Sequence, residues 1–304
     1  MEVFAVIEEM LTLFIIMAIG YIANKVSFIT KEGNRLLSKL IVNITLPAMV
    51  LASVMSIGEK MAGWDLLLLL AVAFASYAIL GLLAFLTPRI LRAPREKAGV
   101  YSFLAMFGNV GFVGFPIITA VYGKEAVFYA ALFNIPFNLL IFSVGVAMLS
   151  AGEKFRLSRQ VLLNPSLLAS ILALILYILP LKFPGPIVET VDLLGSITVP
   201  GAMLVVGASL GSVPVKEVFN DARVYAVSLV KLLLCPVLIW LCFHQVIDNP
   251  LILGAAVITT AMPSATNAAM LTMEYGGDEA LASKGIFIAT ILSIVTIPLV
   301  ITLL

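Results

Sequence analysis

The feature that most constrains the fold is a series of apolar segments, each about as long as a bilayer is thick. Ten such segments follow one another, at residues 4–24, 36–57, 64–87, 99–122, 125–151, 164–181, 187–212, 222–245, 250–273 and 280–304. A helix needs roughly 20 apolar residues to cross the hydrocarbon core, and in lipid every backbone N–H and C=O group must be paired within the protein. The sequence therefore predicts an all-α polytopic membrane protein with ten transmembrane helices.

Composition supports this class. Of the 304 residues, 62% are hydrophobic and 12% are charged, and the formal net charge is +1. So small a charge argues against a nucleic-acid partner. The two cysteines, Cys235 and Cys242, lie about 10 Å apart along one predicted helix, which is too far for a disulfide. The sequence contains no metal-ligand cluster and no nucleotide-binding motif, so we expect neither a metal nor a cofactor.

Two of the ten segments contain residues that interrupt a helix. Residues 107–116 read Phe-Gly-Asn-Val-Gly-Phe-Val-Gly-Phe-Pro, with three glycines and a proline. Each glycine costs a helix interior about 1 kcal/mol relative to alanine, and a proline costs about 3 kcal/mol. Residues 261–269 read Ala-Met-Pro-Ser-Ala-Thr-Asn-Ala-Ala and lie at the corresponding place in the second half. Paired interruptions of this kind indicate the binding site of a transporter.

The chain also repeats itself at an offset of 153 residues. Residues 44–51, Ile-Thr-Leu-Pro-Ala-Met-Val-Leu, correspond to residues 197–204, Ile-Thr-Val-Pro-Gly-Ala-Met-Leu. Five predicted helices separate equivalent positions. Because this number is odd, the two copies must run through the membrane in opposite directions, which predicts an inverted repeat. The predicted parts are a first five-helix repeat at 1–151, a basic cytoplasmic link at 152–163 and a second repeat at 164–304.

The interruptions supply the predicted substrate site. A broken helix offers unpaired N–H groups and a partial positive charge, which favour an anion. Asn109 and Asn267 add amides, which either contact ligand or pair with the freed backbone. Pro116 and Pro263 are expected chiefly to shape the breaks. The predicted binding residues here are Gly108, Asn109, Gly111, Pro263, Ser264 and Asn267.

Other polar or helix-breaking residues lie in neighbouring segments. Pro47 and Pro200 are expected to break or kink the second and seventh segments, and Asn43 is either a local cap or a further ligand group. Asn134 and Asn138 are four residues apart and share a helix face. Because amides are costly in lipid, this face should point inward, either to line the site or to form an interhelical hydrogen bond.

Lys231 is the only ionisable residue deep inside a predicted span. It lies roughly 13 Å from the cytoplasmic end of its helix, so its ammonium group cannot easily reach the interface. An ionisable group at this depth is a functional hypothesis by default. Three roles stay open: a fixed counter-charge, a group whose proton is coupled to transport, or a structural bond to helix-end carbonyls.

Lys and Arg residues predict the orientation. Of the 18, 14 lie in the links between segments one and two, three and four, five and six, seven and eight, and nine and ten. Basic residues favour the cytoplasmic side. We therefore expect these links to be cytoplasmic and both termini to lie outside a plasma (inner) membrane.

The whole chain resembles the auxin efflux carrier family. The resemblance rests on Asn-Ile-Thr-Leu-Pro at 43–47, residues 108–116, and Ala-Met-Pro at 261–263 running into Glu-Tyr at 274–275. It implies a ten-helix fold like that of sodium/proton antiporters and bile-acid symporters. Helices one, two, six and seven would form a scaffold and homodimer surface, and the other six a mobile transport domain in which broken helices four and nine cross. It also implies elevator-type movement and carboxylate substrates, auxin-like or malonate- and malate-like. The plant exporters have proline at the position of Gly108 and lack an equivalent of Asn267.

These observations favour a secondary transporter of a small organic anion, working by alternating access. The sequence leaves open the substrate, the direction, and coupling to sodium or protons. The alternative is a monovalent cation/proton exchanger of the same fold, which is disfavoured because neither interruption contains a carboxylate. Residues 207–211, Gly-Ala-Ser-Leu-Gly, match a hydrolase nucleophile motif, but they lie in an apolar helix and indicate close helix packing instead. We therefore expect that the protein is not an enzyme.

Overall fold

The computed structural model describes residues 3–55, 63–150, 164–179, 181, 183–213, 215–275 and 277–304. Nearly all of these residues are helical, and none lies in a β-strand. The all-α class predicted from the sequence is confirmed for this part of the chain. The predicted link at 152–163 lies outside the described residues.

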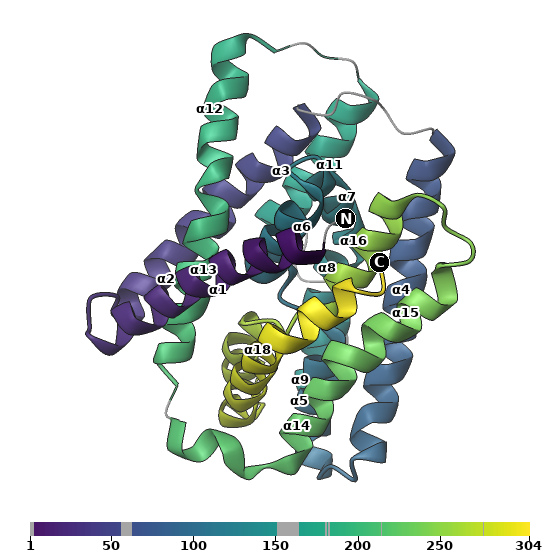
Figure 1. Cartoon of the computed structure of the whole chain (residues 1–304). Coiled ribbons are helices and arrows are strands. Elements are labelled where there is room, and N and C mark those ends of the chain that lie inside the picture. Colours follow the sequence, from purple (N-terminus) through teal and green to yellow (C-terminus); the bar gives the residue numbers. More distant parts are fainter. Residues whose placement is uncertain are drawn as a thin grey trace. The chain divides into compact units, whose positions relative to one another are not determined.

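The helices are shown in Figure 1. They are α1 (Val3–Lys25), α2 (Lys31–Leu40), η1 (Ile41–Thr45), α3 (Leu46–Met55), α4 (Gly63–Ile90), α5 (Arg95–Met106), η2 (Val110–Gly114), α6 (Phe115–Tyr122), α7 (Ala126–Phe133), α8 (Ile135–Leu140), η3 (Ile141–Gly145), α9 (Val146–Leu149), α11 (Pro165–Ile178), α12 (Gly185–Ser196), α13 (Thr198–Gly211), η4 (Val215–Asn220), α14 (Ala222–Leu229), η5 (Val230–Leu234), α15 (Cys235–Phe243), α16 (Pro250–Ala261), α17 (Asn267–Tyr275) and α18 (Glu279–Ile301).

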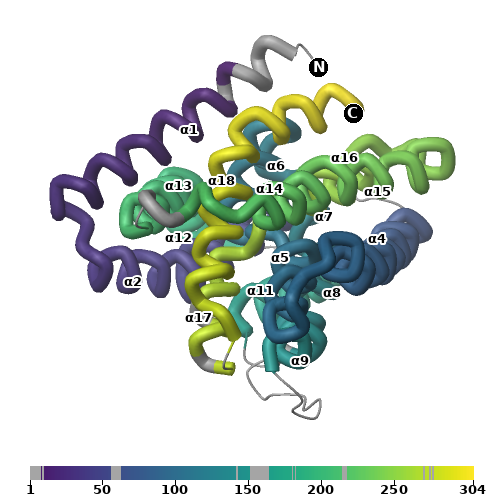
Figure 2. The backbone as a smooth tube through the Cα atoms, turned by 90° about the horizontal axis from the view of Figure 1, so that it is seen from below, coloured from purple at the N-terminus to yellow at the C-terminus, as the bar shows by residue number. Residues whose placement is uncertain are grey.

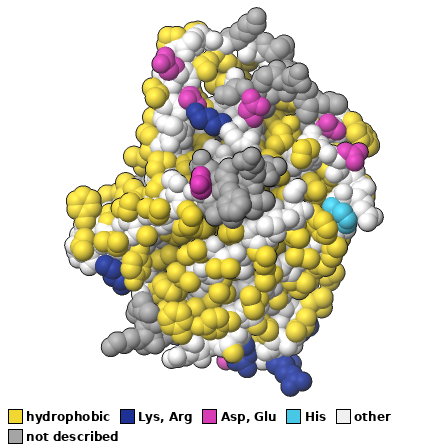
Figure 3. All heavy atoms as spheres, viewed as in Figure 1, with side chains coloured by type: hydrophobic (Ala, Val, Ile, Leu, Met, Phe, Trp, Pro, Cys, Tyr) yellow, Lys and Arg dark blue, Asp and Glu magenta, His cyan; other side chains and the backbone are white. Residues whose placement is uncertain are grey.

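Several of these helices are long and apolar enough to cross a membrane. Within the described residues, five pass this test of length and composition: Lys31–Met55, Gly63–Ile90, Gly185–Gly211, Ala222–Phe243 and Glu279–Ile301. A sixth is reached if Ala126–Leu140 and Ser143–Leu149, which are bent relative to each other, form one span. Hydrophobic side chains also dominate the face shown in Figure 3. These features fit a polytopic membrane protein, and the ten-helix inverted repeat stays a prediction.

Prolines explain where several helices widen. Three π-helical segments, η1, η2 and η5, are each followed two residues later by a proline, at Pro47, Pro116 and Pro236. Proline has no N–H group and its ring clashes with the carbonyl four residues earlier, so the preceding turn opens. Pro47 and Pro116 therefore lie within continuing helical structure, whereas Pro263 lies in a non-helical stretch after α16. Pro200 is the third residue of α13.

The chain folds into two compact units, and each unit draws on both halves of the sequence. Unit 1 consists of Met1–Ala71, Gly111–Ile135 and Leu162–Ser212. Unit 2 consists of Val72–Val110, Pro136–Val161 and Val213–Leu304.

In unit 1, α1 packs along α13 (Figure 1). Glycines make this approach possible, because a Cβ added to Gly207 would overlap the backbone of Met17, and one added to Gly20 would overlap the backbone of Leu204. Close packing through small residues is typical of helices in membranes. The Ser209 hydroxyl oxygen accepts a hydrogen bond from Asn34 Nδ2 at 2.9 Å. The nucleophile-like motif is thus part of a helix contact.

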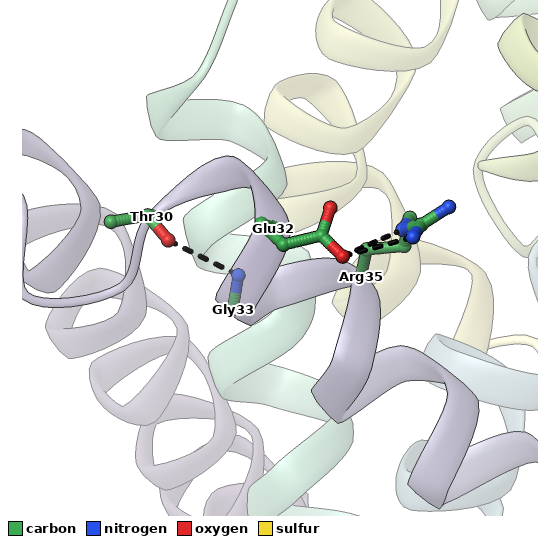
Figure 4. Close-up of polar contacts among 4 residues, drawn as sticks. All are labelled: Thr30, Glu32, Gly33 and Arg35. Atoms are coloured by element: carbon green, nitrogen blue, oxygen red, sulfur yellow. Dashed lines mark hydrogen bonds and ion pairs between the residues drawn. The ribbon is translucent and has the colours of Figure 1, made fainter.

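Helix α2 begins with local polar contacts (Figure 4). Thr30 is its N-cap, and its hydroxyl oxygen accepts a hydrogen bond from the Gly33 N–H at 3.1 Å. Arg35 and Glu32 form an ion pair at 2.9 Å, and both side chains are 63% exposed. An exposed pair of this kind contributes at most about 1 kcal/mol. The cap therefore fixes the start of α2 more than the ion pair does.

In unit 2, α18 packs against α14, α16 and α17, and α15 packs against α16 (Figure 2). Polar contacts fix one end of this bundle. Asp278 is the N-cap of α18, accepts a hydrogen bond from the Leu281 N–H at 2.9 Å, and pairs with Lys97 Nζ at 3.0 Å. Tyr101 donates a hydrogen bond to Asp221 at 3.0 Å, which ties α5 to the start of α14.

The Asp278 contacts predict a pH dependence. Partial burial alone would raise the pKa of this carboxyl, but the Leu281 hydrogen bond and the Lys97 ammonium group outweigh it and hold the pKa below its usual 3.8. A lowered pKa stabilises the fold above the unfolded-state value, and this stability is lost as the pH falls through the folded-state value. We expect wild type to be more heat-stable than Asp278→Asn at pH 6, with the difference shrinking below about pH 4. Thermal unfolding in detergent at several pH values measures this difference in stability. A difference that stays constant with pH would contradict the lowered pKa of Asp278.

Candidate functional site

The non-helical parts of the two predicted interruptions, residues 107–109 and 262–266, lie side by side in unit 2. Helix α5 ends at Met106 and helix α16 at Ala261, and the chain after each is extended. Gly108 and Ser264 form an antiparallel bridge. The Asn109 N–H donates to the Pro263 carbonyl at 2.6 Å, and the Ala265 N–H donates to the Phe107 carbonyl at 2.9 Å. Each interruption thus supplies the backbone partners that the other has lost, as a non-helical stretch within a membrane requires.

The end of α5 is capped by groups from several elements. The last four carbonyls of a helix have no partner within it. Here they accept from four different donors, which are the Phe107 N–H (to Phe103 O, 3.0 Å), Ser264 Oγ (to Leu104 O, 2.9 Å), Cys235 Sγ (to Ala105 O, 3.9 Å) and Lys231 Nζ (to Met106 O, 3.4 Å). The interruption is therefore built from α5, the stretch after α16, and the η5–α15 helix.

Lys231 is buried at this place, with 1% of its surface exposed. It lies in the π-helical turn η5, which precedes Pro236. A Cβ added to Gly108 would lie 3.2 Å from Lys231 Nζ, so the ammonium group lies directly beside the interruption. A cation is favoured near the C-terminal end of a helix, and the contact with Met106 is a bond to a helix-end carbonyl, as one of the three roles left open by the sequence requires. Among the described side chains, no carboxylate forms an ion pair with Lys231.

Three amides of the predicted set belong to this unit. Asn109 is buried, and its backbone is fixed by the bond to Pro263. Asn267 is the first residue of α17 and half-buried; its amide oxygen is buried and has no hydrogen-bond partner among the described residues. The Phe137 ring packs edge-on against Phe107, with ring centres 5.7 Å apart, so α8 also packs against the interruption. Asn138, the next residue of α8, is buried.

The remaining predicted site residues belong to unit 1. Asn43 is exposed and donates to the Lys39 carbonyl, one turn earlier in the same continuing helix, at 2.7 Å. Gly111 faces Leu46, since a Cβ there would lie 3.3 Å from that side chain. Asn134 is the buried C-cap of α7. The structure thus brings together Gly108, Asn109, Pro263, Ser264 and Lys231.

Cys235 is a site residue that sequence reasoning missed. The sequence excluded only a disulfide for this cysteine, whereas in the structure its Sγ donates to the Ala105 carbonyl at the end of α5. Its position four residues after Lys231 could have indicated this, because residues four apart on a helix share a face.

Unit 1 contains a cavity of about 140 Å³ that is separate from this set. It is lined by Met49, Ala52, Ser53, Thr119, Lys124, Val127, Asp192, Gly195, Ser196 and Val199. Lys124 and Asp192 form an ion pair at 2.8 Å, and the rest of the wall is almost wholly apolar. None of the predicted site residues lines this cavity, so the candidate site rests on the paired interruption.

The hydrogen bond from Ser264 should contribute measurably to stability. Ser264→Ala leaves the buried Leu104 carbonyl without this donor, which costs about 1–3 kcal/mol. Ser196→Ala removes only a bond to Leu193 in the same exposed turn. Thermal unfolding should show a clearly lower midpoint for Ser264→Ala than for Ser196→Ala. Equal midpoints would mean that this contact does not hold the two interruptions together.

Comparison with known proteins gives consistent results over the whole chain. Residues 5–161 and 154–301 match the model of a family described as "Membrane transport protein". An "Uncharacterized transporter" of Methanothermobacter thermautotrophicus is 27% identical over 96% of each chain. A "Putative malonate transporter" of Rhizobium meliloti is 25% identical over 94% of this chain and 92% of its own. An "Uncharacterized transporter" of Escherichia coli K12 is 22% identical over 96% of each chain.

Proposed function

Because the chain belongs to the membrane transport protein family, the family of the auxin efflux carriers, we propose that it is a secondary transporter of a small organic anion that binds at the paired interruption. The family resemblance seen in the sequence motifs is confirmed by this match. The protein is a multi-pass membrane transporter and not an enzyme, since the family and the relatives named above are transporters.

The observation that carries the proposal is the charge at the interruption. Lys231 brings a buried ammonium group to Gly108, and no described carboxylate pairs with it. A charge removed from water needs an ionic partner. The buried Asn109 amide adds a group of the kind that carboxylates bind. An organic carboxylate supplies what this arrangement lacks, and one relative bears the name "Putative malonate transporter", in which malonate is a dicarboxylate.

We further propose the fold and movement that the sequence predicts. Two inverted five-helix repeats, at 1–151 and 164–304, would form a scaffold and a mobile domain that carries the interruption across the membrane in an elevator-type movement. The basic links would be cytoplasmic, both termini would lie outside the plasma membrane, and a homodimer would form through the scaffold helices. Sodium or proton coupling would allow import, because each negative charge moving inward against 100 mV costs about 2.3 kcal/mol.

Cation/proton exchange is the second candidate, and one observation favours it. The buried Asn267 amide oxygen has no partner among the described residues, and such an oxygen suits a monovalent or divalent cation. The sequence of both interrupted segments, 99–122 and 250–273, contains no Asp or Glu that would balance the charge of a bound cation. The buried Lys231 ammonium group, beside Gly108, would also disfavour a cation at the interruption. We therefore favour an anion.

Charge movement in proteoliposomes on solid-supported membranes tests the proposal. Malonate, malate, acetate and indole-3-acetate would be applied with and without sodium at two pH values. We expect at least one anion to evoke a saturable current, and its dependence on sodium or pH would identify the coupling. Currents evoked by sodium or proton jumps alone, with none for any anion, would favour cation exchange instead.

A further inference from the structure

Lys231 is a poor match for a purely structural cap. Its only hydrogen bond to a described residue, from Nζ to Met106 O, is 3.4 Å long. Charge-assisted N–H···O bonds are usually about 2.7–2.9 Å, and an ammonium group has three donors. A lysine selected only to cap α5 would approach the carbonyl more closely. The position of the ammonium group therefore calls for a further acceptor.

Gly108 makes room for Lys231. A Cβ at position 108 would lie 3.2 Å from Lys231 Nζ, 3.3 Å from Lys231 Cε and 3.3 Å from Met262 Cβ. These distances are shorter than ordinary van der Waals contacts. Any larger residue at 108 must displace the lysine end or open the bridge between Gly108 and Ser264. The Lys231 ammonium group can therefore lie at this place because residue 108 is glycine.

The charged groups described elsewhere do not neutralise Lys231. The ion pairs among the described residues are Arg35–Glu32, Lys97–Asp278 and Lys124–Asp192. Lys231 Nζ donates to the Met106 carbonyl, and Cys235, four residues further along the same helix, donates to the Ala105 carbonyl. A buried ammonium group without a counter-ion is strongly unfavourable. A carboxylate from outside the chain would remove this penalty each time it binds.

We propose that the Lys231 ammonium group binds one carboxylate of the substrate, and that Gly108 is the positioning residue that keeps it at the interruption. The inference rests on the proposed function and assigns direct contact with the substrate to Lys231 and a positioning role to Gly108. It commits to an acidic substrate of which at least one carboxylate is ionised when bound. Lys231 contacts the substrate directly, whereas Gly108 acts through Lys231.

Transport kinetics in proteoliposomes test this pair. Labelled malonate is the first probe, and labelled acetate and labelled indole-3-acetate are tested in the same assay. We expect Lys231→Met to raise KM for the transported anion at least tenfold, and Lys231→Arg to keep part of the affinity. Gly108→Ala should raise KM when Lys231 is present. It should add little to KM in the Lys231→Met background, because the side chain it displaces is gone. An unchanged KM in Lys231→Met, or equal effects of Gly108→Ala in both backgrounds, would overturn the proposal.

Thermal unfolding in detergent separates this inference from the proposed function. Saturating malonate, or whichever probe wild type transports, should raise the unfolding midpoint of wild type and not of Lys231→Met. A variant that is less stable but is still protected by the anion would show a structural lysine and overturn the assignment. If wild type transports no carboxylate and none protects it, the proposed function fails. If carboxylates protect wild type and Lys231→Met alike, only the role of Lys231 fails.

Discussion

Replacement of Asn109 by alanine is expected to abolish most substrate-dependent transport while leaving a folded protein. The Asn109 side chain is buried beside the bridge between the interruptions, and its backbone N–H bonds to the Pro263 carbonyl at 2.6 Å. Alanine retains that backbone bond, so the pairing of the two stretches survives. The loss of a hydrogen bond to a charged ligand costs about 1.5–3 kcal/mol, or roughly one to two orders of magnitude in kcat/KM.

Labelled-anion uptake into proteoliposomes measures this effect, with a thermal unfolding curve as the test of folding. Asn220→Ala is the matched control, because Asn220 is an exposed amide at the end of η4. We expect the control to transport like wild type. Wild-type kinetics in Asn109→Ala would show that the amide lies at the interruption for backbone reasons alone.

The second large effect concerns the packing of α1 against α13. Alanine is a better helix residue than glycine by about 1 kcal/mol, so Gly→Ala inside a helix stabilises wherever there is space. A Cβ at Gly185, the first residue of α12, meets nothing within 4 Å, whereas a Cβ at Gly207 overlaps the Met17 backbone. Gly207→Ala must push the helices apart, at a cost of about 1–3 kcal/mol or more.

The two substitutions are chemically identical, which makes their comparison sharp. Thermal unfolding in detergent should show a midpoint several degrees lower for Gly207→Ala, and an unchanged or higher midpoint for Gly185→Ala. Similar midpoints for both variants would contradict the close approach of α1 and α13.

The sequence could predict where the chain is interrupted, because glycine and proline in an apolar segment have a backbone cost that lipid cannot offset. It predicted the two stretches around Gly108 and Pro263 from this cost and from their equivalent places in the two halves. It could not predict the bond from Asn109 to Pro263, or the register that pairs Gly108 with Ser264. Register between distant segments depends on tertiary packing, which has no local signature.

The chemistry of single residues was predicted less completely. Burial of Lys231 followed from its depth in an apolar segment, but its contact with Gly108 depends on how η5 meets the end of α5. Pro47 was expected to break or kink its helix, and the structure shows a π-helical turn before it within a continuing helix. A proline opens the preceding turn, and only the packing around it decides whether the helix then continues.

The most direct test of the account is counterflow of a labelled anion. Proteoliposomes loaded with unlabelled malonate, malate, acetate or indole-3-acetate would be diluted into a trace of the same labelled anion, without an ion gradient. Counterflow needs only binding and alternating access, so it does not depend on the coupling ion or on net charge movement. The account predicts transient accumulation of at least one carboxylate by wild type, and little or none by Asn109→Ala or Lys231→Met. Accumulation of no carboxylate by wild type, or equal accumulation by all three proteins, would contradict an anion site at the paired interruption.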